Sequence, residues 1–467
     1  MTTINSVKKD SIDTMCKKNC SENQVYSPQR YSLLAIQSII SALLNLLHFP
    51  MMLLTFLCLL PSETNTHQLV FNLLFFSGIA TILQATIGIK FPVLISPSNL
   101  FISGFIFILK SPYWEQYSNA DLYAMGPSLR HDEFTNRSRE LRGVLILSGF
   151  FFSIVCGILW HLPIKLPSST VSATLISFSL LNINQILSEK EMPLFSILAF
   201  SLSLVFYCTK NIKIPFSDKI NTDGFYVNFK QFSVLLSSII IVAINNNSEN
   251  ENNKLLDKAI ASHQWYSFSL PFKDFVLPKF STKSFVLLPV FFSQFVASYC
   301  CFRALNKEKE IYLKALLLEI IFNVVVAAIG VIVPMAIDPT SIGLLQMTKV
   351  KHTESSVIAG GLIVLFSIIV KIIALFSYIS YPVLCGINLF LHGQLLEKGL
   401  EEMDSDKTER SIIAVSVLSG LVLSSSSLGM ERNILYSIAV LIIKSPVLIT
   451  FIMSIVMSVV FKMFNNK

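Results

Sequence analysis

The chain has 467 residues, of which 53% are hydrophobic and only 14% are charged. Soluble domains carry about 25% charged residues, so this composition excludes an ordinary soluble globular fold. The net charge is +7, and the lysines lie mostly in short connecting segments. The cytoplasmic loops of membrane proteins carry the same excess of positive charge. We therefore expect a lipid bilayer around the chain and no nucleic-acid partner.

Apolar runs of roughly 18 or more residues recur along the chain, which predicts an all-α polytopic membrane protein. Residues 1–30 are polar and basic and lack an apolar signal-peptide core, so we expect a cytoplasmic N-terminal tail. The first repeat is predicted over residues 31–245. Its seven membrane segments are expected at 31–60, 68–88, 92–109, 143–161, 168–187, 191–209 and 229–245.

The most hydrophilic segment, residues 246–283, is predicted to be an extracellular loop between the two halves. The second repeat is predicted over residues 284–462, followed by a cytoplasmic C-terminus at 463–467. Because each half has an odd number of segments, the two repeats must be inverted, which gives fourteen segments in all. Those of the second repeat are expected at 284–302, 312–335, 336–348, 355–378, 382–397, 411–427 and 442–462.

Two of these segments, the third and the tenth, are interrupted by prolines and small polar residues. The third breaks at Phe91-Pro92 and again around Pro97, and the tenth breaks between Pro334 and Gly343. Lipid does not tolerate the unpaired backbone groups of a break, but the interior of a protein or the wall of a cavity does. Interrupted segments at matching places in two repeats indicate a transporter's binding site. We therefore expect a substrate site between the two breaks, near the middle of the membrane.

Two predicted loops carry glycosylation sequons, at Asn136 and Asn246. Counting from a cytoplasmic N-terminus, both loops fall outside, and we expect a multi-pass protein of the plasma membrane with both termini in the cytoplasm. Asn246 is the better candidate, because Asn136 lies only about seven residues before the predicted fourth segment. The sequence contains no nucleophile–base pair, phosphate loop or metal-ligand spacing, so we expect neither an enzyme, nor a metal site, nor an organic cofactor.

Five motifs follow one another along the chain. The third segment carries Gln84-x3-Gly88-x2-Phe91-Pro92. The fourth, tenth, eleventh and twelfth segments carry, in order, Arg139-Glu-Leu-Arg-Gly143, Ser341-x-Gly343-x4-Thr348-Lys349, Lys371-x2-Ala374-Leu-Phe376 and Tyr381-Pro-Val-Leu-x-Gly386. Taken in this order, they resemble the motifs of the nucleobase–ascorbate transporter family (solute carrier family 23, xanthine/uracil permease-like), and the similarity is nearest its animal, ascorbate-type branch.

The resemblance implies a core domain of segments 1–4 and 8–11, and a gate domain of segments 5–7 and 12–14. The third and tenth segments would each pair a short strand with a half-helix, and the substrate would lie between the strands. Such a protein would transport a small polar or anionic solute, ascorbate- or nucleobase-like, by moving the core domain against the gate domain. Sodium or a proton would be the coupling ion, and a homodimer would form through the gate domain.

This sequence departs from the family pattern at the site. The eighth segment has no acid where the family carries a glutamate and an aspartate; depending on register, Ser293 and Ala297 or Gln294 and Ser298 stand there. Because no carboxylate remains in the eighth segment, ion coupling is doubtful. In the tenth segment, Ser341 also replaces an asparagine of the family motif. The alternative is a transport-inactive paralogue with an interaction or scaffolding role in the membrane. An anion transporter or channel of a related fold is a third interpretation.

The candidate substrate-binding residues are polar side chains on the first, third, eighth and tenth segments. Each has a structural alternative: it satisfies backbone groups freed by a proline, or it joins neighbouring helices. The candidates are Gln37, Ser96, Ser98, Asn99, Ser293, Gln294, Ser298, Thr340 and Ser341.

Three charged residues occur in apolar segments, where an unpaired charge is costly. Asp338 is either the ion-coupling acid or the N-cap of the half-helix that follows it. Glu319 and Lys371 are expected to be structural buried charges that face the protein interior, each paired or hydrogen-bonded, with a direct pair between them as one option.

Overall fold

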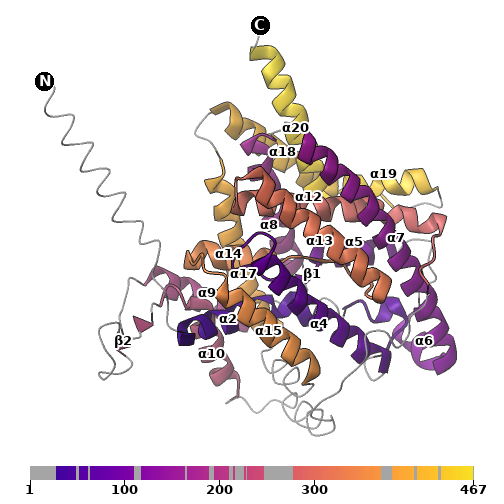
Figure 1. Ribbon diagram of the computed structural model, residues 1–467, viewed down its shortest axis with the longest axis horizontal. Coiled ribbons are helices and arrows are strands. Elements are labelled where there is room, and N and C mark those ends of the chain that lie inside the picture. Colours follow the sequence, from indigo (N-terminus) through magenta and orange to yellow (C-terminus); the bar gives the residue numbers. More distant parts are fainter. Residues whose placement is uncertain are drawn as a thin grey trace, which may run out of the picture.

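The computed structural model is a bundle of helices with two very short sheets (Figure 1). It describes residues 28–465 except for 49–51, 61–63, 110–116, 163–165, 189–193, 210–213, 216–225, 228, 247–276, 370–380, 404–406, 427 and 430–432.

The first half of the chain ends with α10. Its elements are α2 (Pro28–Leu43), the π-helical turn η1 (Leu44–His48), the 3-10 turn η2 (Thr55–Leu57), α4 (Thr64–Thr86), β1 (Ile95–Pro97), α5 (Asn99–Leu109), α6 (Asn119–Ala124), α7 (Pro127–His161), α8 (Ser168–Leu187), α9 (Leu194–Cys208), β2 (Ile214–Pro215), β3 (Tyr226–Val227) and α10 (Ser233–Asn246).

The second half repeats the order of a helix pair, a strand with a short helix, and further helices. Its elements are the 3-10 turn η3 (Thr282–Leu287), α12 (Leu288–Leu305), α13 (Lys309–Ile329), β4 (Met335–Ile337), α14 (Pro339–Thr348), α15 (Glu354–Ile368), α17 (Tyr381–Glu401), α18 (Lys407–Ser424), α19 (Ile434–Lys444) and α20 (Pro446–Asn465).

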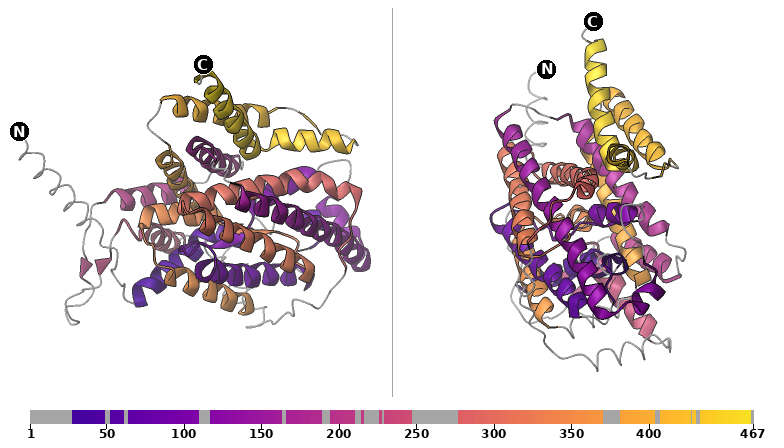
Figure 2. Two further views of the ribbon diagram at one scale, coloured as in Figure 1. Left: turned by 45° about the horizontal axis from the view of Figure 1, so that its top comes forward. Right: turned by 90° about the vertical axis from the view of Figure 1, so that its right-hand side faces the viewer.

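The packing of the helices follows this repeat. In the predicted core domain, α4 packs against α15, and α13 packs against α7. Because α4 and α13 are the second segments of their repeats and α7 and α15 are the fourth, the same contact between a second and a fourth segment occurs twice. In the predicted gate domain, α8 packs against α17, α18 and α20. Both views of Figure 2 place the C-terminal helices α18–α20 together on one side of the molecule, away from α4 and α15.

The two broken segments meet in the interior of the bundle. β1 and β4 pair antiparallel, with Ile95 opposite Ile337 and Pro97 opposite Met335, and both strands are buried. The N–H of Ser98 donates to the oxygen of Pro334 at 2.9 Å, and the N–H of Asp338 donates to that of Leu94 at 2.9 Å. Each strand leads directly into a half-helix, α5 or α14, so the predicted pairing of strand and half-helix is confirmed.

Contacts between connecting segments agree with the predicted sidedness. On the predicted outer side, the N–H of Lys279 donates to the oxygen of Arg139 at 3.0 Å. On the predicted inner side, the ammonium of Lys349 lies 3.5 Å from the Glu401 carboxylate, and that of Lys307 lies 3.4 Å from Glu402. Segments assigned to the same side therefore lie together, which is what alternating membrane crossings require.

The predicted loop that carries Asn136, residues 110–142 between the third and fourth segments, is wrong over most of the part that the structure describes. The segment contains α6 and the first sixteen residues of α7, a single helix of 35 residues. Hydropathy detects only the apolar part of such a helix, whereas Pro127 at its first turn and the helix formers that follow allow it to begin earlier. Asn136 is therefore an exposed residue on a helix rather than in a loop.

The predicted last segment, 442–462, is also wrong as a single helix. It is divided at Ser445 into α19 and α20, because Pro446 has no N–H to donate and its ring hinders a helical conformation in the preceding residue. Seven of the described helices are long and apolar enough to span a membrane, and the shorter apolar helices α9, α10, α15 and α19 add to them. The number of fourteen segments stays a prediction.

A pair of glycines brings α4 and α15 into close contact. A Cβ atom added to Gly78 would lie 2.6 Å from the oxygen of Gly360, and one added to Gly360 would lie 2.8 Å from the oxygen of Gly78. Small residues at such crossings let helix backbones approach closely, which is how helices in membranes gain packing contacts.

We expect Gly360→Ala to lower the thermal stability of the purified protein, because the new methyl group overpacks this crossing at a typical cost of about 1–3 kcal/mol. Gly361→Ala is the matched control: a Cβ there meets no atom within 4 Å. Both changes raise helix propensity equally. Fluorescence-detected unfolding in detergent measures the melting temperature of each variant. Equal melting temperatures for the two variants would contradict the packing argument.

Candidate functional site

The two half-helices begin at the strand pair, and both have side-chain caps. The hydroxyl of Ser98 accepts from the N–H of Phe101 at 3.1 Å, and the carboxylate of Asp338 accepts from the N–H of Thr340 at 2.8 Å. The N-terminus of a helix carries partial positive charge and unpaired N–H groups. Two such ends on either side of one strand pair form a polar centre inside an apolar bundle.

A chain of side-chain hydrogen bonds leads from α5 through α12 to α13. The hydroxyl of Ser98 donates to Gln294, whose amide nitrogen donates to the Ser298 hydroxyl at 3.0 Å. Ser298 in turn donates to the Glu319 carboxylate at 2.6 Å. The structure thus brings three predicted site residues, Ser98, Gln294 and Ser298, into one buried network, and its far end is an acid from the ninth segment.

Residues of α13 also hold β4 in place. The second carboxylate oxygen of Glu319 accepts from the N–H of Ile337 at 3.3 Å. The amide of Asn323 both donates to the oxygen of Met335 and accepts from its N–H, at 2.7 Å each. Glu319 is 7% exposed and hydrogen-bonded, as predicted for a structural buried charge, whereas Lys371 and any pair that it forms lie outside the described residues.

Asp338 is fully buried and serves as the N-cap of α14, so the capping alternative is confirmed. Besides the N–H of Thr340, its carboxylate accepts from the Thr340 hydroxyl at 2.6 Å and from the Asn45 amide at 3.0 Å. The hydroxyl of Ser341 donates to the main-chain oxygen of Asp338 at 2.7 Å. The role of Asp338 as an ion-coupling acid stays a prediction.

Asn99, the first residue of α5, reaches a different helix. Its amide nitrogen donates to Asn182 at 2.7 Å and to Gln185 at 2.9 Å, both on α8. The sequence analysis did not include these two residues. They are amides three positions apart in an apolar segment, so they lie on one helix face, and that spacing could have identified them.

With this geometry established, the comparisons with known proteins can be set beside it. A model described as "Permease family" matches residues 29–428, which is most of the chain. The chain belongs to the nucleobase–ascorbate transporter family. The family and the fold are those of multi-pass membrane transporters rather than of enzymes.

The similar proteins are distant in sequence. A Clostridium perfringens (strain 13 / Type A) protein named "Putative purine permease" is 26% identical over 140 residues, which are 29% of this chain and 31% of the relative. The match therefore spans about a third of the relative's length.

Two solved structures of solute carrier 26 member A9 share the fold. The murine anion transporter in its inward-facing state is 12% identical, with a TM-score of 0.55, and the match covers 95% of this chain and 70% of that one. A second structure of solute carrier 26 member A9 is 13% identical, with a TM-score of 0.51, and the match covers 93% of this chain and 68% of that one. At these identities, the likeness shows the fold alone.

Two of the remaining predicted site residues, Gln37 and Ser293, bond to elements outside the core domain. Gln37 bonds the main chain at the start of α10, donating to the oxygen of Gln231 at 3.0 Å and accepting from the N–H of Leu235 at 3.2 Å. The hydroxyls of Ser293 and Ser445 lie 2.8 Å apart, which links α12 to the residue between α19 and α20. Ser96 is buried on β1.

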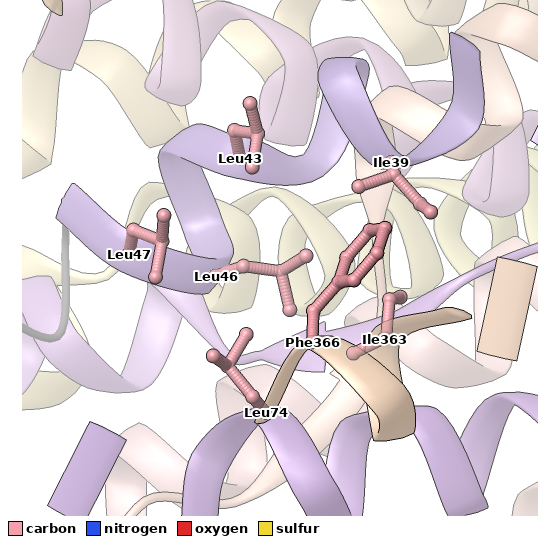
Figure 3. A pocket seen from close by; sticks show the side chains of 7 residues that line it. All are labelled: Ile39, Leu43, Leu46, Leu47, Leu74, Ile363 and Phe366. Atoms are coloured by element: carbon pink, nitrogen blue, oxygen red, sulfur yellow. The ribbon is translucent and has the colours of Figure 1, made fainter. Parts of the chain in front are cut away.

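An apolar hollow lies elsewhere in the protein, between α2, η1, α4 and α15 (Figure 3). Its lining side chains are hydrocarbons and cannot hydrogen-bond a polar solute. They are Ile39, Leu43, Leu46, Leu47, Leu74, Ile363 and Phe366. The polar groups that could recognise a solute are those around the strand pair.

Proposed function

We propose that the protein transports a small polar or anionic solute, ascorbate- or nucleobase-like, by moving its core domain against its gate domain. The observation that carries the proposal is the paired strands β1 and β4, which bring the N-termini of α5 and α14 to one buried polar centre. Partial positive charge and N–H groups there suit an anion or a polar ring. Membership of the permease family supports the same proposal.

In this proposal, transport is not coupled to an ion. The side chains of the eighth segment at the centre, Gln294 and Ser298, are neutral, and the acid Asp338 is engaged as a helix cap. Moving a solute against each tenfold gradient requires about 1.4 kcal/mol from some driving ion. Uniport or exchange needs no sodium or proton site, and fits an eighth segment whose side chains at the centre are neutral.

The proposal includes a setting in the cell. We place the protein in the plasma membrane as a homodimer that associates through the gate domain, with both termini in the cytoplasm and a glycan on Asn246 more readily than on Asn136. A mobility shift after glycosidase treatment, lost in Asn246→Gln, would support this orientation.

Uptake of labelled ascorbate, uracil, urate and chloride in cells expressing the protein tests the function. We expect uptake of at least one organic solute, above that of untransfected cells and unchanged when sodium is replaced. Uptake that required sodium would overturn the uncoupled mechanism. Surface expression without uptake of any of the four solutes would contradict the transport proposal.

One observation favours the second candidate, a transport-inactive paralogue with an interaction or scaffolding role. The polar groups around the strand pair already bond one another, as Ser98 does with Gln294 and Asn99 with Asn182. A solute must displace such bonds to bind. The uptake experiment decides between the two candidates.

A further inference from the structure

An amide bridge crosses the boundary between the core and gate domains. Asn99 belongs to the core half-helix α5, whereas Asn182 and Gln185 belong to the gate helix α8. Asn182 is 1% exposed and Asn99 7% exposed, and Gln185 is half-buried. If the core domain moves against the gate domain, this bridge must open and re-form in every cycle, next to the caps of the strand pair.

The bridge has a defined polarity. The amide nitrogen of Asn182 donates to the main-chain oxygen of Phe178 at 2.9 Å. Because that oxygen can only accept, the carbonyl end of the Asn182 side chain must face Asn99, and Asn99 must present its nitrogen. Two neutral acceptor oxygens, from Asn182 and Gln185, therefore converge on one N–H₂ group.

We propose that Asn182 and Gln185 form the gate-domain half of the substrate site. They hold the amide of Asn99 in this arrangement, and they hold an N–H group of the solute when it is bound. This inference rests on the proposed transport function. It assigns substrate-positioning roles to two residues of the fifth segment, which lies outside the segments where the sequence places the site.

The chemistry of the pair defines the solutes that it accepts. Two acceptor oxygens attract an N–H donor and repel an anion, and within the described part of the chain neither Asn182 nor Gln185 bonds a charged side chain. The amide nitrogen of Gln185 makes no hydrogen bond among the described residues, so it can donate to a carbonyl. Together the acceptor and the donor of one amide match a ring N–H adjacent to a C=O.

The test is saturation uptake by the full-length protein in cells, with labelled uracil as the N–H-bearing probe and labelled ascorbate as the anionic probe. We expect Gln185→Ala to raise KM for uracil about three- to tenfold, the effect of one or two lost hydrogen bonds. Vmax per surface-expressed molecule should change less than twofold, and ascorbate uptake should be unaffected. Asn182→Ala should behave similarly.

Asn184→Ala is the matched control, because Asn184 is an exposed amide between the two residues on α8. Equal losses for uracil and ascorbate, or a Gln185→Ala variant that matches Asn184→Ala, would overturn the inference and leave the transport function standing. If the wild-type protein took up ascorbate but not uracil, the inference would also be overturned and the transport function would stand. If wild-type protein at the surface transported none of the labelled solutes, the function itself would fail. Because Gln185 is half-buried, its variant remains informative even if Asn182→Ala does not fold.

Discussion

Replacing Asp338 with alanine is expected to reduce the folded protein below the level needed for detectable uptake. Two buried donors, the N–H of Thr340 and the amide of Asn45, lose their acceptor at once, and the Thr340 hydroxyl keeps only its longer bond of 3.3 Å to the main-chain oxygen of Ser41. Each buried donor left unpaired costs about 1–3 kcal/mol, and natural proteins have little stability to spare. Surface biotinylation and size-exclusion chromatography of a fluorescent fusion would measure the loss.

Asp338→Asn separates the two roles considered for this residue. Asparagine caps helices about as well as aspartate, and its remaining oxygen can still accept from Thr340. We therefore expect this variant to reach the surface in near-normal amounts and to keep much of its uptake, with a modest loss because its NH₂ group opposes the Asn45 donor. Normal surface expression with no uptake would mean that the charge itself is needed, and ion coupling would then replace capping as its role.

The sequence located the polar centre well because prolines mark it. Pro92 and Pro97 interrupt one apolar segment, Pro334 and Pro339 interrupt another, and each set precedes a short apolar helix. Proline cannot donate a backbone hydrogen bond, so breaks of this kind are visible without a structure. The resemblance to the family adds a strand and a half-helix at each break, whereas the antiparallel pairing of the two strands is a finding of the structure.

The partners of the site residues were harder to predict. Ser98 and Gln294 are separated by 196 positions, and Asn99 and Asn182 by 83. Hydropathy gives the order of the segments but neither the rotation of a helix about its axis nor its depth, and these decide which side chains meet. The same limitation affected α7, whose charged first half is invisible to a method that detects only apolar length.

Glu319 shows what such long-range contacts add to the interpretation. From sequence it is a buried charge in need of a partner. In the structure it is the terminal acceptor of the network that begins at Ser98, and it also binds the backbone of β4 through Ile337. Both of its oxygens accept hydrogen bonds in this arrangement, and the bonds of the network then all run in one direction, so that the Ser98 hydroxyl donates to Gln294.

Replacing Glu319 with glutamine, which has nearly the same shape, is therefore expected to lower uptake at low solute concentration by about tenfold or more. If the new NH₂ group faces Ile337, two donors oppose each other; if it faces Ser298, the whole network must reverse. Either arrangement leaves a buried donor without an acceptor, which costs about 1–3 kcal/mol, and each 1.4 kcal/mol is a factor of ten. KM should rise more than Vmax falls, because the change reaches the solute through the orientation of Ser98.

Glu310→Gln is the matched control, since Glu310 is an exposed acid in the first turn of the same helix. It should leave surface expression, KM and Vmax unchanged. Glu319→Ala should in addition lower the melting temperature, because it leaves the Ser298 hydroxyl and the Ile337 N–H without an acceptor. If Glu319→Gln and Glu310→Gln gave the same uptake kinetics, the network would be only a brace for β4, and the orientation of Ser98 would have no part in binding the solute.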